Sequence, residues 1–234
     1  GGYVCELTPG FNKVIASCGG SGVVIDARAD LHYNATGLGR YVRKGVPLEL
    51  GLGMPIPGPP TPGGFALTWA DPDAQSPEPI ALGPRWRVAG EWHSLAELSA
   101  SLQHEVRVFE ETTERVSFAV LYRGEGIDWI LEEHFTLTAE SLDLRSKLIL
   151  KKNANAEDAR IGYRIPLLVT DGRARAEIEH DAATALVRYH DCAYQIAWPH
   201  GCDATLSEQP VANRHGHYRL LETTGEGTEI AVQL

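Results

Sequence analysis

The chain has 234 residues, 43% of them apolar and 22% charged, so it is long enough to bury its own core without a disulfide or a metal. Its 21 basic and 31 acidic residues give a net charge of −10, which argues against a nucleic-acid-binding protein. No stretch of about 18 apolar residues is present, so no membrane span is expected. The first residues, Gly1 to Val4, do not resemble a signal peptide. We expect a single domain over residues 1–234 that is a fragment of a longer chain, and its localisation stays open between the cytoplasm, the periplasm and the exterior.

Alternation of apolar and polar residues runs through the whole chain. It is clearest from Leu142 to Lys151, where leucine or serine occupies every second position and charged residues fill most of the others. This period is typical of a half-buried antiparallel strand. The same pattern predicts further strands at residues 12–18, 22–28, 65–70, 106–111, 116–122, 129–137, 161–169, 174–180, 183–189, 193–198, 217–223 and 229–234.

Short polar loops separate many of these strands, as at residues 123–126 and 170–173, and their lengths suit β-hairpins. One short helix is indicated at Ser94 to Leu102, with Ser94 as its N-cap and Glu97 at the reciprocal capping position. The segment at about 45–63 is rich in proline and glycine, which predicts a long surface loop. The predicted fold class is all-β, a large antiparallel β-sandwich of two packed sheets with at most one or two short helices. A closed barrel is the weaker alternative.

The densest run of polar residues, from Asp26 to Arg40, is the main candidate for chemistry. On an extended chain, alternate side chains would share one face: Asp26, Arg28, Asp30, His32 and Asn34. Tyr33 would then point the opposite way, unless the chain turns at Asn34. The structural interpretation of the same run is that Asp26 and Arg28 form pairs across strands and that His32 binds backbone groups near a loop.

Three cations follow within five residues, at Arg40, Arg43 and Lys44. They predict either an anion-binding site or an ordinary solvated strand edge. Neighbouring carboxylates elsewhere, such as Glu132 and Glu133, lie on opposite faces of a strand and therefore do not form an acid–base pair for glycoside hydrolysis.

His215 and His217 are spaced to offer two imidazole nitrogens from one side of a strand, so a divalent metal is a minor alternative to the absence of any cofactor. The third ligand stays open among His134, His180, His190, His200 and Asp203. The four cysteines lack the close spacing of a structural zinc site. We expect buried free thiols, with a disulfide between Cys192 and Cys202 as the alternative.

The segment from Ile25 to Arg40, IDARADLHYNATGLGR, with Arg43 to Pro47 after it, resembles the opening of the C-terminal β-sandwich domain of heparinase II/III-like proteins. That group contains polysaccharide lyases and their relatives. Gly162 to Leu168 lies in a meander that is similar to the same large sandwich. The resemblance implies that an N-terminal α/α toroid, absent from this chain, would supply most catalytic residues and that the active site would lie between the two domains.

The chemistry that the resemblance implies is β-elimination beside a uronate, in which a base removes the proton next to the carboxylate. His32 would be the base or would neutralise the carboxylate, Asn34 would donate to the enolate, and Tyr33 is a further catalytic candidate. The cations Arg28, Arg40, Arg43 and Lys44 would hold an acidic polysaccharide or oligosaccharide. The zinc-binding members carry a His-x-His near the start of the domain, whereas here the His215 and His217 pair lies near the other end.

Two other functions stay open. In the first, the chain is a non-catalytic module that binds carbohydrate, supports another domain, or forms a homodimer with a second copy of itself. In the second, it is a metal-dependent enzyme built on His215 and His217. If the chain is instead part of a polysaccharide lyase, the isolated domain is expected to be inactive as a lyase, because the toroid is missing.

Overall fold

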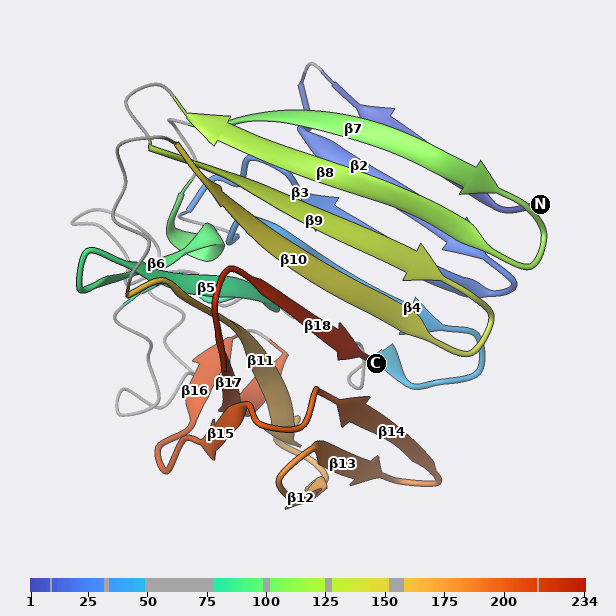
Figure 1. The fold of residues 1–234 in the computed structure, drawn as a ribbon. Coiled ribbons are helices and arrows are strands. Elements are labelled where there is room, and N and C mark those ends of the chain that lie inside the picture. Colours follow the sequence, from blue (N-terminus) through green and yellow to red (C-terminus); the bar gives the residue numbers. More distant parts are fainter. Residues whose placement is uncertain are drawn as a thin grey trace, which may run out of the picture.

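The computed structural model describes residues 1–8, 10–31, 34–48, 78–98, 102–124, 128–151, 158–213 and 215–234. Within these ranges the chain forms antiparallel strands, joined by turns and by one short 3₁₀ helix, Leu95–Glu97 (η3). The strands make three sheets of four, eight and six strands (Figure 1). The all-β class and the sandwich-like architecture are confirmed, although the hydrogen bonds divide the strands into three sheets where two were expected. No helix in the described ranges is long and apolar enough to cross a membrane.

The four-stranded sheet follows chain order, and its strands are β1 (Tyr3–Leu7), β2 (Lys13–Cys18), β3 (Ser21–Asp26) and β4 (Gly37–Arg43). It lies behind the long strands of the eight-stranded sheet in Figure 1, and β1 and β2 contact β7 and β8. Its inward side chains, such as Val14, Val23 and Ile25, join one core with Phe118 and Phe135 of the facing sheet. Burial of these apolar side chains between the two layers is the main stabilising contribution.

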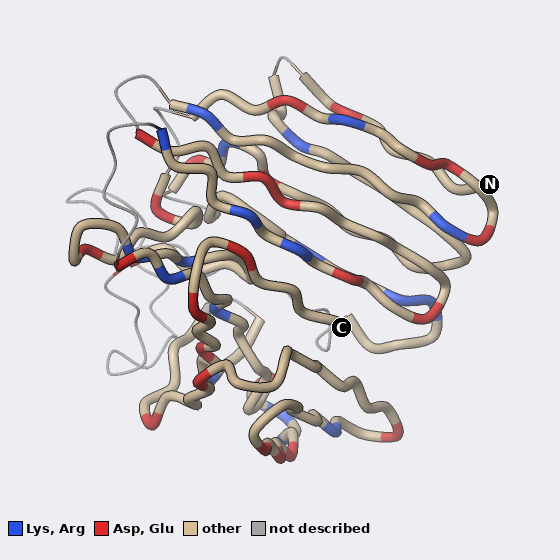
Figure 2. Tube along the Cα trace, in the orientation of Figure 1, with Lys and Arg blue, Asp and Glu red and all other residues tan. Residues whose placement is uncertain are grey.

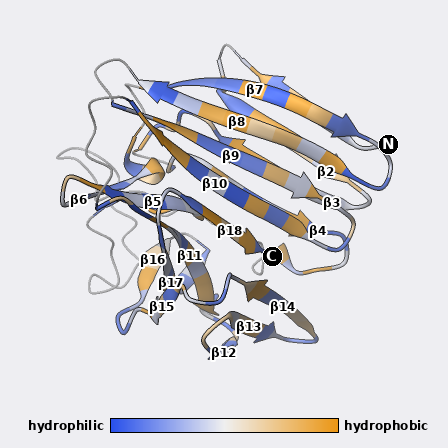
Figure 3. Cartoon of the chain, viewed as in Figure 1, coloured by the Kyte–Doolittle hydropathy of each residue, from blue (hydrophilic) through white to orange (hydrophobic). Residues whose placement is uncertain are grey.

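The eight-stranded sheet has the order β12-β13-β14-β18-β10-β9-β8-β7. Its long strands are β7 (Leu102–Glu111), β8 (Val116–Gly124), β9 (Trp129–Leu137) and β10 (Leu142–Leu150). The remainder are β12 (Glu177–His180), β13 (Thr184–Tyr189), β14 (Cys192–Ala197) and β18 (Glu229–Gln233). Hydropathy alternates along β9 and β10 (Figure 3), as the period-two pattern requires for one face in the core and one toward solvent.

The six-stranded sheet has the order β15-β17-β11-β5-β6, with β16 also paired to β17. Its strands are β5 (Gly83–Val88), β6 (Glu91–Ser94), β11 (Arg160–Thr170), β15 (Asp203–Leu206), β16 (Val211–Asn213) and β17 (Gly216–Glu226). An isolated bridge from Leu38 to Leu82 links the end of the four-stranded sheet to the segment that leads into β5. Through this bridge, β4 is positioned beside the six-stranded sheet.

Several sequence-based boundaries are wrong. The helix expected from Ser94 to Leu102 is only the three residues of η3, and Leu102 already begins β7. Ser94 is its N-cap as predicted, and its side chain accepts a hydrogen bond from the Ala96 N–H. The strands β1, β4, β5, β6, β15 and β16 were not predicted, because they are short, exposed or interrupted by glycine and proline. The predicted strand at 65–70 and most of the loop at about 45–63 lie outside the described residues.

All four cysteines are free, so the disulfide alternative between Cys192 and Cys202 is not realised. Cys18 is buried, as expected for a structural thiol, and burial raises the pKa of its thiol. Cys5 is exposed, so the expectation of burial was wrong there. Cys192 and Cys202 are half-buried.

A polar cluster lies inside the core, under β8, β9 and β10. The Ser146 hydroxyl and the Tyr163 hydroxyl are 2.6 Å apart, and both residues are buried. Glu133 is 3% exposed, and its Oε2 has no hydrogen-bond partner among the described residues. Burial raises the pKa of the Glu133 carboxyl to about 8, while a hydrogen bond with Ser146 acts in the opposite direction. Glu133 is therefore held in its neutral form at physiological pH.

This buried carboxyl makes stability depend on pH. Its folded pKa of about 8 lies above the unfolded value of 4.5, so the folded state binds more protons between these limits and its stability falls as pH rises through them. We predict that Glu133→Gln is close to neutral at about pH 5 and raises the free energy of unfolding by a few kcal/mol, at about 1.4 kcal/mol for each pKa unit, at about pH 9. Urea denaturation at both pH values measures this difference.

Glu132→Gln is the matched control, because Glu132 is the adjacent residue on β9 and faces outward. It should change stability by about 1 kcal/mol or less at either pH. An equal loss of stability at both pH values in Glu133→Gln would contradict the assignment of a neutral buried carboxyl.

Candidate functional site

The polar run singled out in the sequence begins at the end of β3. Asp26 is the last residue of β3 and forms an ion pair with Lys13, its direct partner on β2. The cross-strand pairing expected of Asp26 is therefore present, with Lys13 as its partner, whereas Arg28 is exposed in the loop that follows. His32 and Tyr33 lie outside the described residues, so their catalytic roles stay predictions.

Asn34 is half-buried, and its backbone N–H donates to the Asp30 carbonyl at 2.9 Å. This hydrogen bond between residues four apart shows that Asp30 and Asn34 do not lie in one extended strand.

The predicted cations lie at two faces of β4. Arg40 is opposite Val24 on the outer side of the sheet, whereas Tyr41, its neighbour, is buried. Side chains alternate along a strand, so Arg43 lies on the opposite side from Arg40, at the exposed end of β4. Lys44 follows in the turn and is exposed. The three cations surround the end of an edge strand and do not form one continuous patch.

Residues 34–38 pack against η3 and the segment before β5. The Thr36 N–H donates to the Ala96 carbonyl at 3.3 Å. Ala35, Ala81 and Ala96 form a small buried cluster of their own. Because all three side chains are small, the backbone of the loop after β3 approaches the backbone of η3 closely. The loop therefore lies beside Ala96, the residue before Glu97.

Two carboxyl groups meet at this junction, Glu78 and Glu97, and they are linked by a side-chain hydrogen bond. The pKa of Glu97 is raised to about 7, first by burial and then by the hydrogen bond and charge of Glu78. The pKa of Glu78 is lowered, because the hydrogen bond with Glu97 and the charge of Arg164 outweigh its burial. Two carboxyls in contact cannot both ionise easily, so the pair shares one proton near neutral pH.

Two arginines complete the cluster. Arg164, on β11, is only 15% exposed and forms ion pairs with both Glu78 and Glu222. Arg85, on β5, pairs with Glu222 and lies 4.1 Å from the centre of the Trp92 ring. Trp92 is 41% exposed, so it presents an aromatic surface at the edge of the cluster. With Glu97 protonated, the two guanidinium groups are balanced by the Glu78 and Glu222 carboxylates.

This arrangement can transfer a proton near neutral pH. Glu97 has a pKa close to the working pH of an acid–base catalyst, and Glu78 fixes its proton by a hydrogen bond. The carboxyl pair was not predicted from the sequence, because Glu97 was assigned to helix capping and no motif marks Glu78. One signal was available, since Arg164 is the only charged residue in the apolar stretch from Ile161 to Val169 and such a buried charge requires partners.

The predicted metal pair lies elsewhere. His217 is in β17 and pairs with Thr170 and Ala212, whereas His215 precedes the strand in a turn. Among the described residues, no three histidines, cysteines or carboxylates lie close enough together to hold a metal ion. A metal at His215 and His217 stays a prediction without a third ligand in the described ranges.

Similarity to known proteins is found at the level of structure. No family model matches the sequence, and no curated protein matches it. The fold is similar to part of a mutant of the heparan sulfate lyase HepC from Pedobacter heparinus, with a TM-score of 0.57 and 8% identity over 98% of this chain and 36% of the lyase. A GH36 alpha-galactosidase, AgaB from Geobacillus stearothermophilus, aligns over 98% of this chain and 40% of its own, with 10% identity and a TM-score of 0.48. At these identities the likeness establishes the sandwich fold, and this chain spans about a third of the lyase.

The shared proton of the carboxyl pair is directly measurable. We predict that NMR of chain labelled with ¹³C at the glutamate carboxyl carbons finds one group titrating near pH 7 that disappears in Glu97→Gln. Glu78→Gln should lower the pKa of Glu97, because the negative charge of Glu78 is lost while the positive charges of Arg164 and Arg85 remain.

Glu91→Gln is the control, because Glu91 is exposed on β6 and should leave this titration unchanged. Glu133→Gln separately identifies the other carboxyl with a raised pKa. Titration of Glu97 at its ordinary pKa of 4.5 in the unmodified chain would contradict the shared proton.

Proposed function

We propose that this chain is the β-sandwich part of a heparinase II/III-like protein, which assists the binding or β-elimination of an acidic, uronate-containing polysaccharide. The observation that carries the proposal is the packing of the loop after β3 on η3, in which Thr36 bonds to Ala96, the residue before Glu97. The loop belongs to the segment that resembles the family, and the carboxyl pair supplies proton-transfer chemistry to the same place.

The fold likeness supports the same proposal. The similar region covers nearly the whole chain but only 36% of a protein described as a heparan sulfate lyase. A sandwich of this kind therefore occurs in a longer enzyme that acts on an acidic polysaccharide. We propose that an α/α toroid supplies the remaining catalytic groups, as the resemblance implies.

Each group has a role that follows from its chemistry. Glu97 accepts or returns a proton, because its pKa is near neutral. Asn34 donates a hydrogen bond to the enolate that develops on the uronate. Arg85 and Arg164 already balance Glu78 and Glu222, so they orient the pair and do not neutralise a substrate carboxylate. The anionic chain instead passes around the end of the edge strand β4, where it meets Arg43 and Lys44 on one side and Arg40 on the other.

Binding of uronate oligosaccharides tests this assignment. We predict that heparan sulfate, hyaluronan or alginate oligosaccharides bind the chain more weakly as salt rises, because exposed charges are screened. Replacing Arg40, Arg43 and Lys44 together by Gln should weaken binding about tenfold, at about 0.5 kcal/mol for each exposed cation. Isothermal titration calorimetry measures both effects.

The matched control replaces Arg115, Arg173 and Arg188 by Gln, which removes the same charge from other exposed sites. It should leave binding within about twofold of the unmodified chain, apart from long-range screening effects. Absence of binding to all three polysaccharides would refute the proposal. Equal weakening by both triple variants would remove the β4 cations from it.

The catalytic part of the proposal is tested by following the absorbance of the unsaturated product. The isolated chain should release none from heparan sulfate, hyaluronan or alginate, because the toroid would supply most of the catalytic residues. Turnover by the isolated chain would contradict this division of labour. In the longer protein, Glu97→Gln should lower kcat more than it changes KM, because the group is used for proton transfer.

A further inference from the structure

A groove of about 680 Å³ lies on the outer face of the eight-stranded sheet, on a different sheet from the carboxyl pair and from the β4 cations. This volume is within the range of about 300–1,000 Å³ that is usual for small-ligand sites. Its floor comes from β9, β10 and β18, and one wall comes from the end of β14. The polar floor residues are Glu132, His134, Thr136, Asp143, Arg145, Lys147, Glu229 and Gln233.

The groove exists because β14 leaves the sheet. β14 pairs with β18 through a single residue pair, Ala197 with Gln233. Pro199 then follows, which has no N–H to continue the ladder. Trp198 is fixed at the bend, since its backbone N–H donates to Ala183 and its indole Nε1–H donates to Ala182 at 3.0 Å. Trp198 is buried in the core, with 5% of its surface exposed, so the exposed Pro199 supplies most of the apolar wall beside the polar floor.

The departure of β14 also opens an edge of β18. Leu142 and Leu234 exchange both backbone hydrogen bonds. In an antiparallel pair such bonded positions recur at every second residue, so Val232 and Ile230 of β18 also bond to β10. The N–H and C=O of Ala231 lie between these positions and point away from β10, toward the side that β14 has left. No backbone partner for Ala231 on that side is found in the described part of the chain. The edge is too short to pair with an added strand, because β14 occupies Gln233.

The floor side chains are held in fixed positions. Along β10, Arg145 is bound by Glu229, and the Gln233 side-chain amide donates to Asp143 at 2.8 Å. On β9, His134 is bound by Glu132, and its ring stacks on Phe109 with 5.6 Å between centroids and 9° between planes. Lys147 forms no ion pair among the residues that the structure describes, so its ammonium group is available to a ligand.

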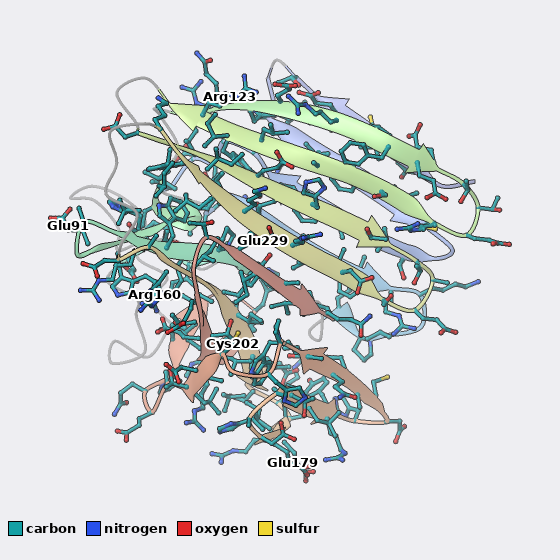
Figure 4. All side chains as sticks on the ribbon, viewed as in Figure 1. Glu91, Arg123, Arg160, Glu179, Cys202 and Glu229 are labelled. Carbon is teal, nitrogen blue, oxygen red and sulfur yellow. The ribbon has the colours of Figure 1, made fainter. Side chains whose placement is uncertain are left out.

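The charge of the floor selects the class of ligand. Two cations, Arg145 and Lys147, face three carboxylates, Glu132, Asp143 and Glu229, so the formal balance with neutral histidine is 2 − 3 = −1. Figure 2 shows basic and acidic residues interspersed along β10 and its neighbours, and Figure 4 labels Glu229 at the start of β18. A polyanion would meet net repulsion here. An uncharged ligand with many hydroxyl groups would meet both donors and acceptors.

We infer that this groove binds a short, uncharged oligosaccharide. One face of a sugar ring packs on the exposed Pro199 and on the small accessible part of Trp198, while its hydroxyl groups bond to the polar floor. Lys147 and the Ala231 N–H donate hydrogen bonds, and Asp143 and the Ala231 carbonyl accept them. A peptide added as a strand is disfavoured by the short free edge, and an acidic sugar by the charge balance. The site is thus separate from the one proposed for uronate chains.

The test uses cellotriose and maltotriose as neutral probes and trigalacturonate as an anionic probe of equal length. We expect at least one neutral trisaccharide to bind, with the backbone amide resonance of Ala231 shifting on titration and trigalacturonate causing no such shift. Ala231→Tyr fills the groove from an exposed strand position and should weaken binding at least tenfold. Ala193→Tyr is the matched control, since Ala193 is an exposed alanine of β14 outside the groove, and should leave binding unchanged.

Lys147→Gln and Asp143→Asn each remove one charged hydrogen-bonding partner and should each weaken binding about tenfold. They provide a readout that does not depend on the bulky substitution. Replacement of Arg40, Arg43 and Lys44 by Gln should leave the neutral probe unaffected, which separates this inference from the proposed function. The inference is overturned if neither neutral probe shifts Ala231 at millimolar concentration, if trigalacturonate binds there more tightly, or if Ala231→Tyr binds as well as the unmodified chain.

Discussion

The close approach of residues 34–38 to residues 80–97 joins the four-stranded sheet to the six-stranded sheet. It includes a hydrogen bond from Thr36 to Ala96, a bridge between Leu38 and Leu82, and a contact of three alanines. Small side chains are required, because a larger one at any of these alanines would separate the backbones. The contact places the four-stranded sheet beside the six-stranded sheet, and it places the loop after β3 beside Glu97. The candidate site depends on this packing more than on any single catalytic group.

Acidic residues outnumber basic residues by 31 to 21, and the fold keeps some of them neutral. Glu133 is protonated inside the core, and Glu97 shares a proton with Glu78 where the sheets meet. Glu78 and Glu222 are instead compensated by Arg85 and Arg164. The outer groove uses a third arrangement, in which cations and carboxylates alternate along the strands and nearly cancel. The proposed anion site at the end of β4 and the proposed neutral-sugar site in the groove therefore differ in their charge.

The sequence was most informative where one face of a strand is buried. The run from Leu142 to Lys151 predicted β10, Leu142–Leu150, almost to the residue, because alternation reports directly on the buried face. β4 was missed, since its glycines disrupt the pattern, and one of them, Gly39, lies opposite a register shift of β3. There an added Cβ would lie 2.9 Å from the Asp26 carboxylate, so close packing explains this glycine.

The candidate sites were less predictable for a related reason. Glu78, Glu97 and Arg164 come from distant parts of the chain, and the pairing of strands that joins them is not encoded in local periodicity. The same holds for the groove, in which Trp198 meets Lys147 and Ala231 only because β14 departs from β18. The segment from Ile25 to Pro47 contains one side of this junction, whereas the residues on the other side were not recognised in the sequence.

The central claim is that the loop after β3 and the carboxyl pair form one site for an acidic sugar. It is tested most directly by NMR of the chain during titration with a uronate trisaccharide, observing the Asn34 side-chain amide and the Glu97 carboxyl carbon together. The account predicts that both resonances shift with the same dissociation constant, while that of the exposed Glu91 stays fixed. Saturable binding that leaves both Asn34 and Glu97 unchanged would contradict it.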